Sequence, residues 1–272
     1  MSPVLELRRY TLHEGKREEL VTLFEREFIE PQEALGIDLV GQFCDLRDEN
    51  AFVWLRGFRE MEARARALSR FYGGRVWLAH RDAANATMVH SDNVLLLRPA
   101  RPDAGFAAAE RARGPAEGRC AENAPVAATI LFLSDGADEA DVISFFELAI
   151  APEVVKSGAA VLGYFVTEPA RNSFERLPVR EDVRVFVWFA GCSDLEMLER
   201  ATDSQSDTMR TAAQAPALAW PPELLLLEPT PRSRLSGSSP PSAALVDLHN
   251  VSVAAERSDR RIVSTMSHPP PR

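Results

Sequence analysis

The sequence has few cysteines and no close pair of them. Cys44, Cys120 and Cys192 are the only three in 272 residues, and Cys44 and Cys192 fall inside strand-like runs. An odd number of widely spaced thiols argues against a disulfide framework and against a thiolate zinc site. We therefore expect Cys44 and Cys192 to be small, buried apolar side chains.

Long apolar runs, basic blocks and a leader segment are also missing. No apolar run is long enough to span a bilayer. The formal charge of −9, without a block of Lys or Arg, argues against a nucleic-acid partner. The first residues, 1–4, pass directly into a strand pattern without a charged or apolar leader. These absences predict a soluble, cytoplasmic protein without a membrane span.

Common catalytic motifs are absent as well. The sequence contains no nucleophile elbow, Gly-rich phosphate loop or Cys–His pair. His80 and His90 do not have metal-ligand spacing, and no carboxylate–histidine cluster surrounds them. We therefore expect neither a metal site nor a bound cofactor, and haem is a poor third alternative because only these two histidines could be axial ligands.

What the sequence does contain is an internal repeat. Residues 5–99 have the pattern strand, helix, strand, strand, helix, strand, and residues 126–229 repeat that order. The segment 53–57 (VWLRG) returns as 187–191 (VWFAG), and the apolar run 94–99 returns as 223–229. The pattern predicts two βαββαβ units, 1–100 and 125–230, joined by a linker, 101–124.

A βαββαβ unit is ferredoxin-like: a four-stranded antiparallel sheet with both helices on one face. Because strands alternate faces and both faces here carry bulky groups, the second face must also be covered. We predict an α+β fold in which the two sheets pack against each other as an intrachain, pseudo-dimeric α+β barrel with the helices outside. The Ser/Pro-rich segment 231–272 is expected to be a disordered tail, with docking of 243–253 as an extra strand the alternative.

Polar residues concentrate on one face of the first unit. If Leu5, Leu7, Val53 and Leu55 face the helices, the opposite face points into the space between the sheets. That face carries Glu6, Arg8, Tyr10, Trp54 and Arg56. Such a set in an apolar cavity is typical of a small-molecule site, in which the arginines would bind an anionic or carbonyl oxygen, and Tyr10 and Glu6 could move protons.

Two alternatives stay open for these residues. Glu6 could simply pair with Arg8 or Arg56, since buried ion pairs are common and contribute little net stability. A second polar segment, 77–85, holds His80 as a candidate acid or base and Asn85 as a candidate ligand-binding residue. A lone histidine on a surface helix is usually just polar.

The first unit resembles the NIPSNAP family of the dimeric α+β-barrel superfamily. The resemblance lies in 5–12 (LELRRYTL) followed by Gly15, in 55–58 (LRGF), 61–65 (MEARA), 71–74 (FYGG) and 80–88 (HRDAANATM), and in 91–97. It covers about residues 4–100, and the second half keeps the pattern of elements without these motifs. The resemblance implies a barrel but no settled activity, because the superfamily includes cofactor-free monooxygenases, haem-degrading enzymes and lactone isomerases.

The resulting hypothesis is a protein that binds a small aromatic or polyketide-like molecule in the barrel cavity. Its candidate reaction is that of a cofactor-independent monooxygenase or isomerase, with Tyr10 and His80 as catalytic candidates. Glu6, Arg8, Trp54, Arg56 and Asn85 would bind the ligand. The alternative is a non-catalytic interaction module whose barrel core is filled, and association into a homo-oligomer stays open.

Overall fold

The computed structural model describes residues 3–107, 113–114, 124–212 and 215–245. The first unit runs β1 (Val4–Leu12), α1 (Arg17–Leu23), η1 (Phe24–Phe28), α2 (Ile29–Glu33), β2 (Asp38–Asp45), β3 (Ala51–Phe58), α3 (Met61–Tyr72), α4 (Arg75–Asn85) and β4 (Met88–Pro99). The second runs β5 (Val126–Leu133), α5 (Glu139–Phe145), η2 (Phe146–Ile150), α6 (Ala151–Lys156), β6 (Ala160–Thr167), β7 (Val185–Gly191), α7 (Leu195–Thr211) and β8 (Leu218–Pro229). A 3-10 turn, η3 (Ala243–Leu245), follows.

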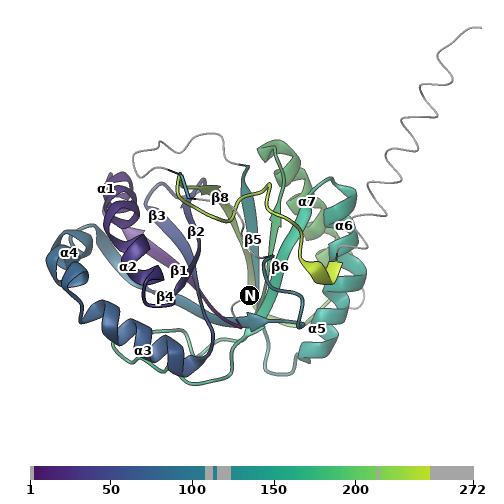
Figure 1. Ribbon diagram of the computed structural model, residues 1–272. Helices are drawn as coiled ribbons and strands as arrows, with labels where there is room; N and C mark the ends of the chain where they lie inside the picture. The colour runs from purple at the N-terminus through teal and green to yellow at the C-terminus, as the bar shows by residue number, and fades with distance from the viewer. Residues whose placement is uncertain (1–2, 108–112, 115–123, 213–214, 246–272) are drawn as a thin grey trace, which may run out of the picture.

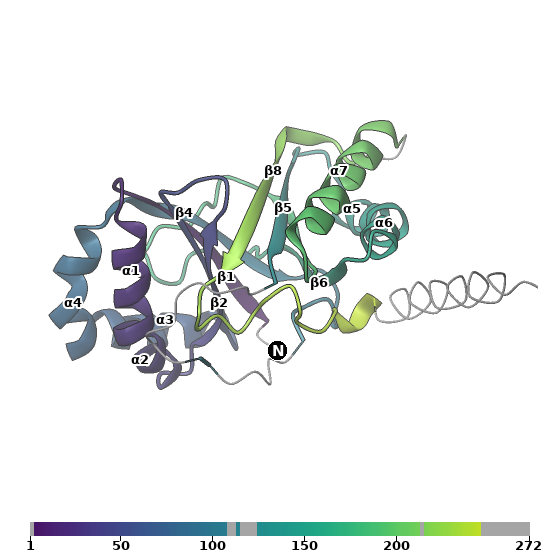
Figure 2. The ribbon, with the colours of Figure 1, turned by 90° about the horizontal axis from the view of Figure 1, so that it is seen from above.

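The eight strands close into one barrel in the order β1-β3-β2-β8-β5-β7-β6-β4. Two antiparallel seams join the units, β2 with β8 and β4 with β6. The helices of the two units lie outside the barrel on opposite sides (Figures 1 and 2). The predicted intrachain α+β barrel is therefore confirmed.

The two units repeat each other down to their irregularities. Each first helix contains a π-helical turn, η1 in one unit and η2 in the other. Each second strand shifts register at a glycine, Gly41 in β2 and Gly163 in β6. Each first helical segment also ends at a glycine with positive φ, 81° at Gly36 and 85° at Gly158, a conformation that glycine adopts without a Cβ penalty. Shared irregularities of this kind indicate that both units have the same backbone conformation.

The two faces of β1 and β3 are the reverse of the prediction. Leu5, Leu7, Val53 and Leu55 lie in the barrel interior, in one buried apolar cluster with side chains of the second unit such as Val187. Their neighbours Glu6, Arg8 and Arg56 therefore lie on the outer face, beneath the helices. An eight-stranded barrel has an interior just wide enough for side chains to fill it. Apolar residues from both sheets fill it here, and the predicted chamber with one polar wall does not exist.

The segment after β8 corrects the predicted tail in its first part. Residues 230–245, here called the C-terminal strap, cross from the first unit to the second (Figure 1). Backbone N–H groups of the strap donate to Gln42 O (2.9 Å, from Thr230) and to Val161 O (2.8 Å, from Ser242), and Leu235 joins the interior cluster. These bonds and two buried leucines, Leu235 and Leu245, order a segment whose composition is poor in apolar residues. Residues 246–272, and with them most of 243–253, lie outside the described residues.

The cysteines behave as expected where they are described. Cys44 and Cys192 are buried, and Cys120 lies outside the described residues. No helix in the described part of the chain is both long and apolar enough to cross a membrane.

Candidate functional site

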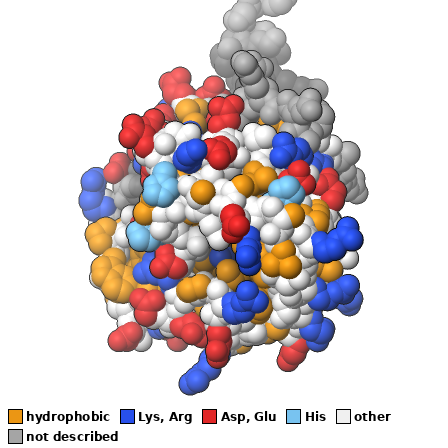
Figure 3. Space-filling view, turned by 90° about the vertical axis from the view of Figure 1, so that its left-hand side faces the viewer, with side chains coloured by type: hydrophobic (Ala, Val, Ile, Leu, Met, Phe, Trp, Pro, Cys, Tyr) orange, Lys and Arg blue, Asp and Glu red, His pale blue; other side chains and the backbone are white. Residues whose placement is uncertain are grey.

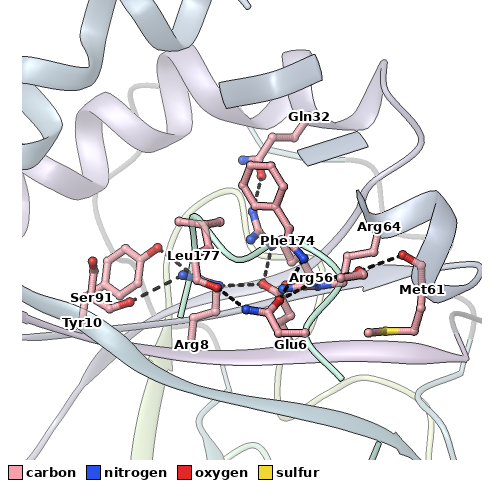
Figure 4. A network of polar contacts seen from close by, with 12 residues as sticks. Glu6, Arg8, Tyr10, Gln32, Arg56, Met61, Arg64, Ser91, Phe174 and Leu177 are labelled. Carbon is pink, nitrogen blue, oxygen red and sulfur yellow. Dashed lines mark hydrogen bonds and ion pairs between the residues drawn. The ribbon is translucent and has the colours of Figure 1, made fainter. Parts of the chain in front are cut away.

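A buried carboxylate surrounded by three guanidinium groups lies between the sheet and the helices of the first unit (Figure 4). Glu6 Oε2 accepts hydrogen bonds from Arg8 Nη1 and Arg56 Nε, both at 2.7 Å, and Glu6 Oε1 accepts one from Arg64 Nε at 2.5 Å. All four side chains have zero solvent exposure. We call these four residues the arginine–glutamate cluster.

Strand register and helix periodicity place these side chains together. Residues 6, 8 and 10 of β1 share a face because side chains alternate along a strand. Glu6 stands opposite Arg56 of β3, and Arg8 opposite Trp54. Arg64 comes from α3, three residues after Met61 and four before Leu68, and therefore lies on the buried side of that helix.

Neighbouring aromatic and polar groups fix the arginines further. Arg8 Nε donates to Tyr10 Oη at 3.1 Å, and Arg56 Nη1 donates to Gln32 Oε1 at 3.3 Å. The guanidinium carbons of Arg8 and Arg56 lie 5.5 and 4.9 Å from the ring centroid of Trp54, which is cation–π distance.

The connection between β6 and β7 covers this cluster from the second unit. Residues 168–184, here called the β6–β7 loop, bring Asn172 and Ser173 to Arg64, whose Nη1 donates to Asn172 Oδ1 at 3.0 Å and to Ser173 Oγ at 3.1 Å. Phe174 stacks on Tyr72 with ring centroids 6.0 Å apart. The site therefore contains residues of both units although its charges come from one.

The cluster has an excess of buried positive charge, because three guanidinium groups face one carboxylate. Burial alone would raise the pKa of Glu6, but attraction to Arg56, Arg8 and Arg64 outweighs it and holds this pKa well below its usual range. Burial raises the pKa of Tyr10. Glu6 is thus a permanent anion and a poor base near neutral pH, and Tyr10 is a neutral hydroxyl.

Several buried polar atoms of this site have no hydrogen-bond partner among the described residues. They are Arg56 Nη2, Arg64 Nη2, Trp54 Nε1 and both amide atoms of Gln42, which stands opposite Trp54 in β2. Residues 126–229 contribute no such atom within their described part. There the repeat's second tryptophan, Trp188, donates from Nε1 to Gln205 Oε1 at 2.8 Å.

A buried hydrogen-bond donor without a partner lowers the free energy of unfolding, because its desolvation is not compensated. The first unit therefore differs from the described part of residues 126–229 in having buried polar atoms without a hydrogen-bond partner.

Comparison with known proteins finds a family match within the first unit. Residues 5–101 match the NIPSNAP family model. A NIPSNAP family protein of Agrobacterium tumefaciens is 27% identical over 36% of this chain and 89% of its own, with a TM-score of 0.34. No curated protein matches the sequence.

Two solved structures are similar over most of the chain. One is a candidate monooxygenase of Lactobacillus acidophilus, 12% identical, with a TM-score of 0.52 over 87% of this chain and 98% of the other. The other is a candidate monooxygenase of Fusobacterium nucleatum, 10% identical, with the same TM-score over 89% and 98%. At these identities the likeness shows the fold alone.

The matched segment, residues 5–101, holds all the residues predicted for the site, but the structure brings only some of them together. Glu6, Arg8, Tyr10, Trp54 and Arg56 converge. The suggestion that Glu6 simply pairs with its arginines describes these contacts correctly. The other two residues lie apart at the surface: His80 Nε2 is 3.4 Å from Glu27 Oε2, and Asn85 is exposed at the end of α4.

Sequence reasoning missed Arg64, Gln32 and the loop residue Asn172. A signal existed for the first two, because each interrupts the apolar stripe of its helix. Arg64 precedes Leu68 by four residues, and Gln32 follows Phe28 by four. Nothing in the sequence around Asn172 connects it with a site 108 residues away.

A groove of about 550 Å³ opens beside the cluster, against the β6–β7 loop. Leu96, one of its lining residues, is the strand partner of Glu6. Arg98, also in the lining, is paired with Glu139 at 2.6 Å. No group of three potential metal ligands occurs among the described residues.

The surface over the first unit's helices carries mixed charge. Basic and acidic side chains alternate on this face without a single-sign field (Figure 3). The charge that distinguishes the first unit is therefore internal.

Proposed function

We propose that the protein binds a small organic anion with an aromatic or polyketide-like ring at the arginine–glutamate cluster. The observation that carries this proposal is the set of unpaired donors, Arg56 Nη2, Arg64 Nη2 and Trp54 Nε1, in a buried site with excess positive charge. The binding place differs from the barrel cavity expected from the sequence: it lies between the sheet and the helices.

The charge of the site selects the ligand class. A buried charge is stable only when it is paired and hydrogen-bonded, and Glu6 compensates only one of three cations. A carboxylate, phenolate or enolate oxygen would supply the missing negative charge and accept from the free guanidinium nitrogens. The rings of Tyr10 and Trp54 pack edge to face on each other, with centroids 5.9 Å apart, and give the site aromatic surface that would suit a ligand with an aromatic face.

The same groups could support a reaction on such a ligand. Preorganised guanidinium donors stabilise an enolate or phenolate, the intermediate that a cofactor-independent monooxygenase or isomerase must form. Tyr10, kept protonated by burial, would donate a hydrogen bond to a ligand oxygen. Glu6 would hold the arginines in place and take no proton. The candidate monooxygenases of similar fold support this reaction by analogy only.

Calorimetric titration with 2-naphthoate, extended to phenols and quinones, tests the binding proposal. We expect Arg56→Ala and Arg64→Met to weaken binding of 2-naphthoate at least about tenfold, because each removes a charge-assisted bond worth about 1.5–3 kcal/mol. Arg66→Met is the matched control: Arg66 lies on the same helix with its side chain 66% exposed, and its loss should leave the affinity unchanged.

If both buried-arginine variants fold and bind every ligand as the wild type does, the site assignment is wrong. A non-catalytic interaction module is the second candidate, and the filled barrel interior favours it. A crystal structure with ordered water alone at Arg56 Nη2 and Arg64 Nη2, together with no binding across the ligand panel, would decide for this second candidate.

A further inference from the structure

We propose that the second unit has a binding pocket of its own, specific for a neutral, mostly apolar ring compound. A pocket of about 450 Å³ lies between the outer face of the second sheet and α7. Its volume falls in the range of small-molecule sites, about 300–1,000 Å³. The residues that decide its chemistry are Thr129, Leu131, Trp188, Gln205, Met209 and Arg210.

The pocket occupies the place that the arginine–glutamate cluster occupies in the first unit. Thr129 pairs with Trp188 across β5 and β7 just as Arg8 pairs with Trp54 across β1 and β3. In the first unit the long side chain of Arg8 extends into this space, whereas in the second the shorter Thr129 leaves more of it open.

The two connections between strands also differ in length. The β6–β7 loop has 17 residues between Thr167 and Val185 and covers the first unit's cluster, whereas β2 and β3 are joined by only five, 46–50. The short turn reaches β8 through Leu46 N, which donates to Leu226 O at 2.8 Å. The β2–β3 connection therefore gives the second unit no equivalent cover.

The polar groups of the pocket favour an uncharged ligand. Among the described residues that line the pocket, only Arg210 is charged, and it is paired with Asp207 at 2.9 Å. The Trp188 indole is satisfied by Gln205, whose Nε2 donates to Ala201 O at 2.9 Å. The half-buried Thr129 hydroxyl makes no hydrogen bond to another described residue, so it is free to donate one to a ligand oxygen.

Titration with 2-acetylnaphthalene tests this pocket, because this ketone has the ring of 2-naphthoate without its charge. We expect saturable binding that weakens at least tenfold in Met209→Trp, which fills the pocket, and several-fold in Thr129→Val, which removes the hydroxyl. Arg200→Trp is the control. Arg200 lies on the same helix with a 61% exposed side chain, so this substitution introduces a tryptophan outside the pocket.

The two binding proposals separate in this experiment. Arg64→Met should leave the affinity for 2-acetylnaphthalene unchanged, and Met209→Trp should leave that for 2-naphthoate unchanged. No saturable binding of the ketone, or equal affinity in Met209→Trp and Arg200→Trp, overturns the second pocket whatever the first site does. Loss of ketone binding in Arg64→Met would move the ketone to the first unit and also overturn it.

Discussion

At the scale of single residues, Glu6 has more consequence for stability than any of its partners. Removing one arginine breaks one ion pair of the cluster. Removing Glu6 takes from all three arginines the one carboxylate of the described residues that pairs with them. Breaking a buried pair by removing one partner typically costs about 3–5 kcal/mol. An uncharged side chain of the same shape at this position would leave three buried cations without compensation.

We therefore expect Glu6→Gln to lower the free energy of unfolding by about 3–5 kcal/mol, measured by urea denaturation at pH 7. Because the pKa of Glu6 is lowered in the folded protein, Glu6 is protonated at a higher pH in the unfolded chain than in the folded one. The contribution of Glu6 is thus complete above pH 4.5, the ordinary pKa of a glutamate side chain, and is lost progressively below it. Wild-type stability should fall more steeply between pH 5 and about 2 than that of the variant.

Glu14→Gln is the matched control, because Glu14 is an exposed carboxylate in the turn after β1. Its substitution should change stability by less than about 0.5 kcal/mol. Equal pH dependence in the wild type and in Glu6→Gln would show that Glu6 is not held as an anion in the folded protein.

At the scale of elements, the β6–β7 loop is what turns a helix-covered ion cluster into an enclosed site. It has no helix or strand of its own. Near its two ends, the backbone N–H groups of Glu168 and Arg180 donate to Leu96 O (2.9 Å) and Val94 O (2.8 Å) of β4. Between these two points side chains hold it to the first unit: Asn172 and Ser173 at Arg64, and Phe174 at Tyr72. Segments with few buried contacts open at a lower free energy than the core. Access to the cluster should therefore depend on how firmly these side chains hold the loop.

Phe174→Ala tests this dependence. Loss of the stacked ring should raise amide hydrogen exchange in residues 168–184 by about 10- to 100-fold, the effect of about 1.4–2.8 kcal/mol, while exchange in the barrel strands stays close to that of the wild type. Glu175→Ala, at the neighbouring exposed position, should have no effect. Unchanged exchange in the Phe174→Ala loop would show that other contacts hold it closed.

Element positions were largely predictable from the sequence, and their faces were not. Helical spacing and glycine stops located both units, because periodicity reports one buried side directly. A strand that is buried on both faces gives no such indication. The alternation places Leu5 and Glu6 on opposite faces but does not show which of them points into the barrel. The β6–β7 loop was beyond reach for another reason, since its contacts with α3 exist only after the two units have closed.

At the scale of the whole molecule, the C-terminal strap fastens the two halves of one closed strand ring. Its Leu235 is buried in the interior cluster, and the backbone N–H of Leu235 donates to Val40 O of β2 at 3.0 Å. Two residues on, Gly237 N donates to Ala124 O at 2.7 Å. A β-carbon at Gly237 would overlap the carbonyl oxygens of Cys192 and Pro125, so the chain passes here only as glycine.

Because the strap and both strand seams bind the units together, we expect the described body to unfold in a single transition that Leu235→Ala shifts as a whole. Truncating a buried leucine costs about 2–5 kcal/mol, so the urea midpoints followed by tryptophan fluorescence and by far-ultraviolet circular dichroism should fall by the same amount. Ser238→Ala, an exposed strap position, should leave both midpoints in place. Two separated transitions, or a midpoint change in only one of the two signals, would show that the halves fold independently and that the strap merely lies across them.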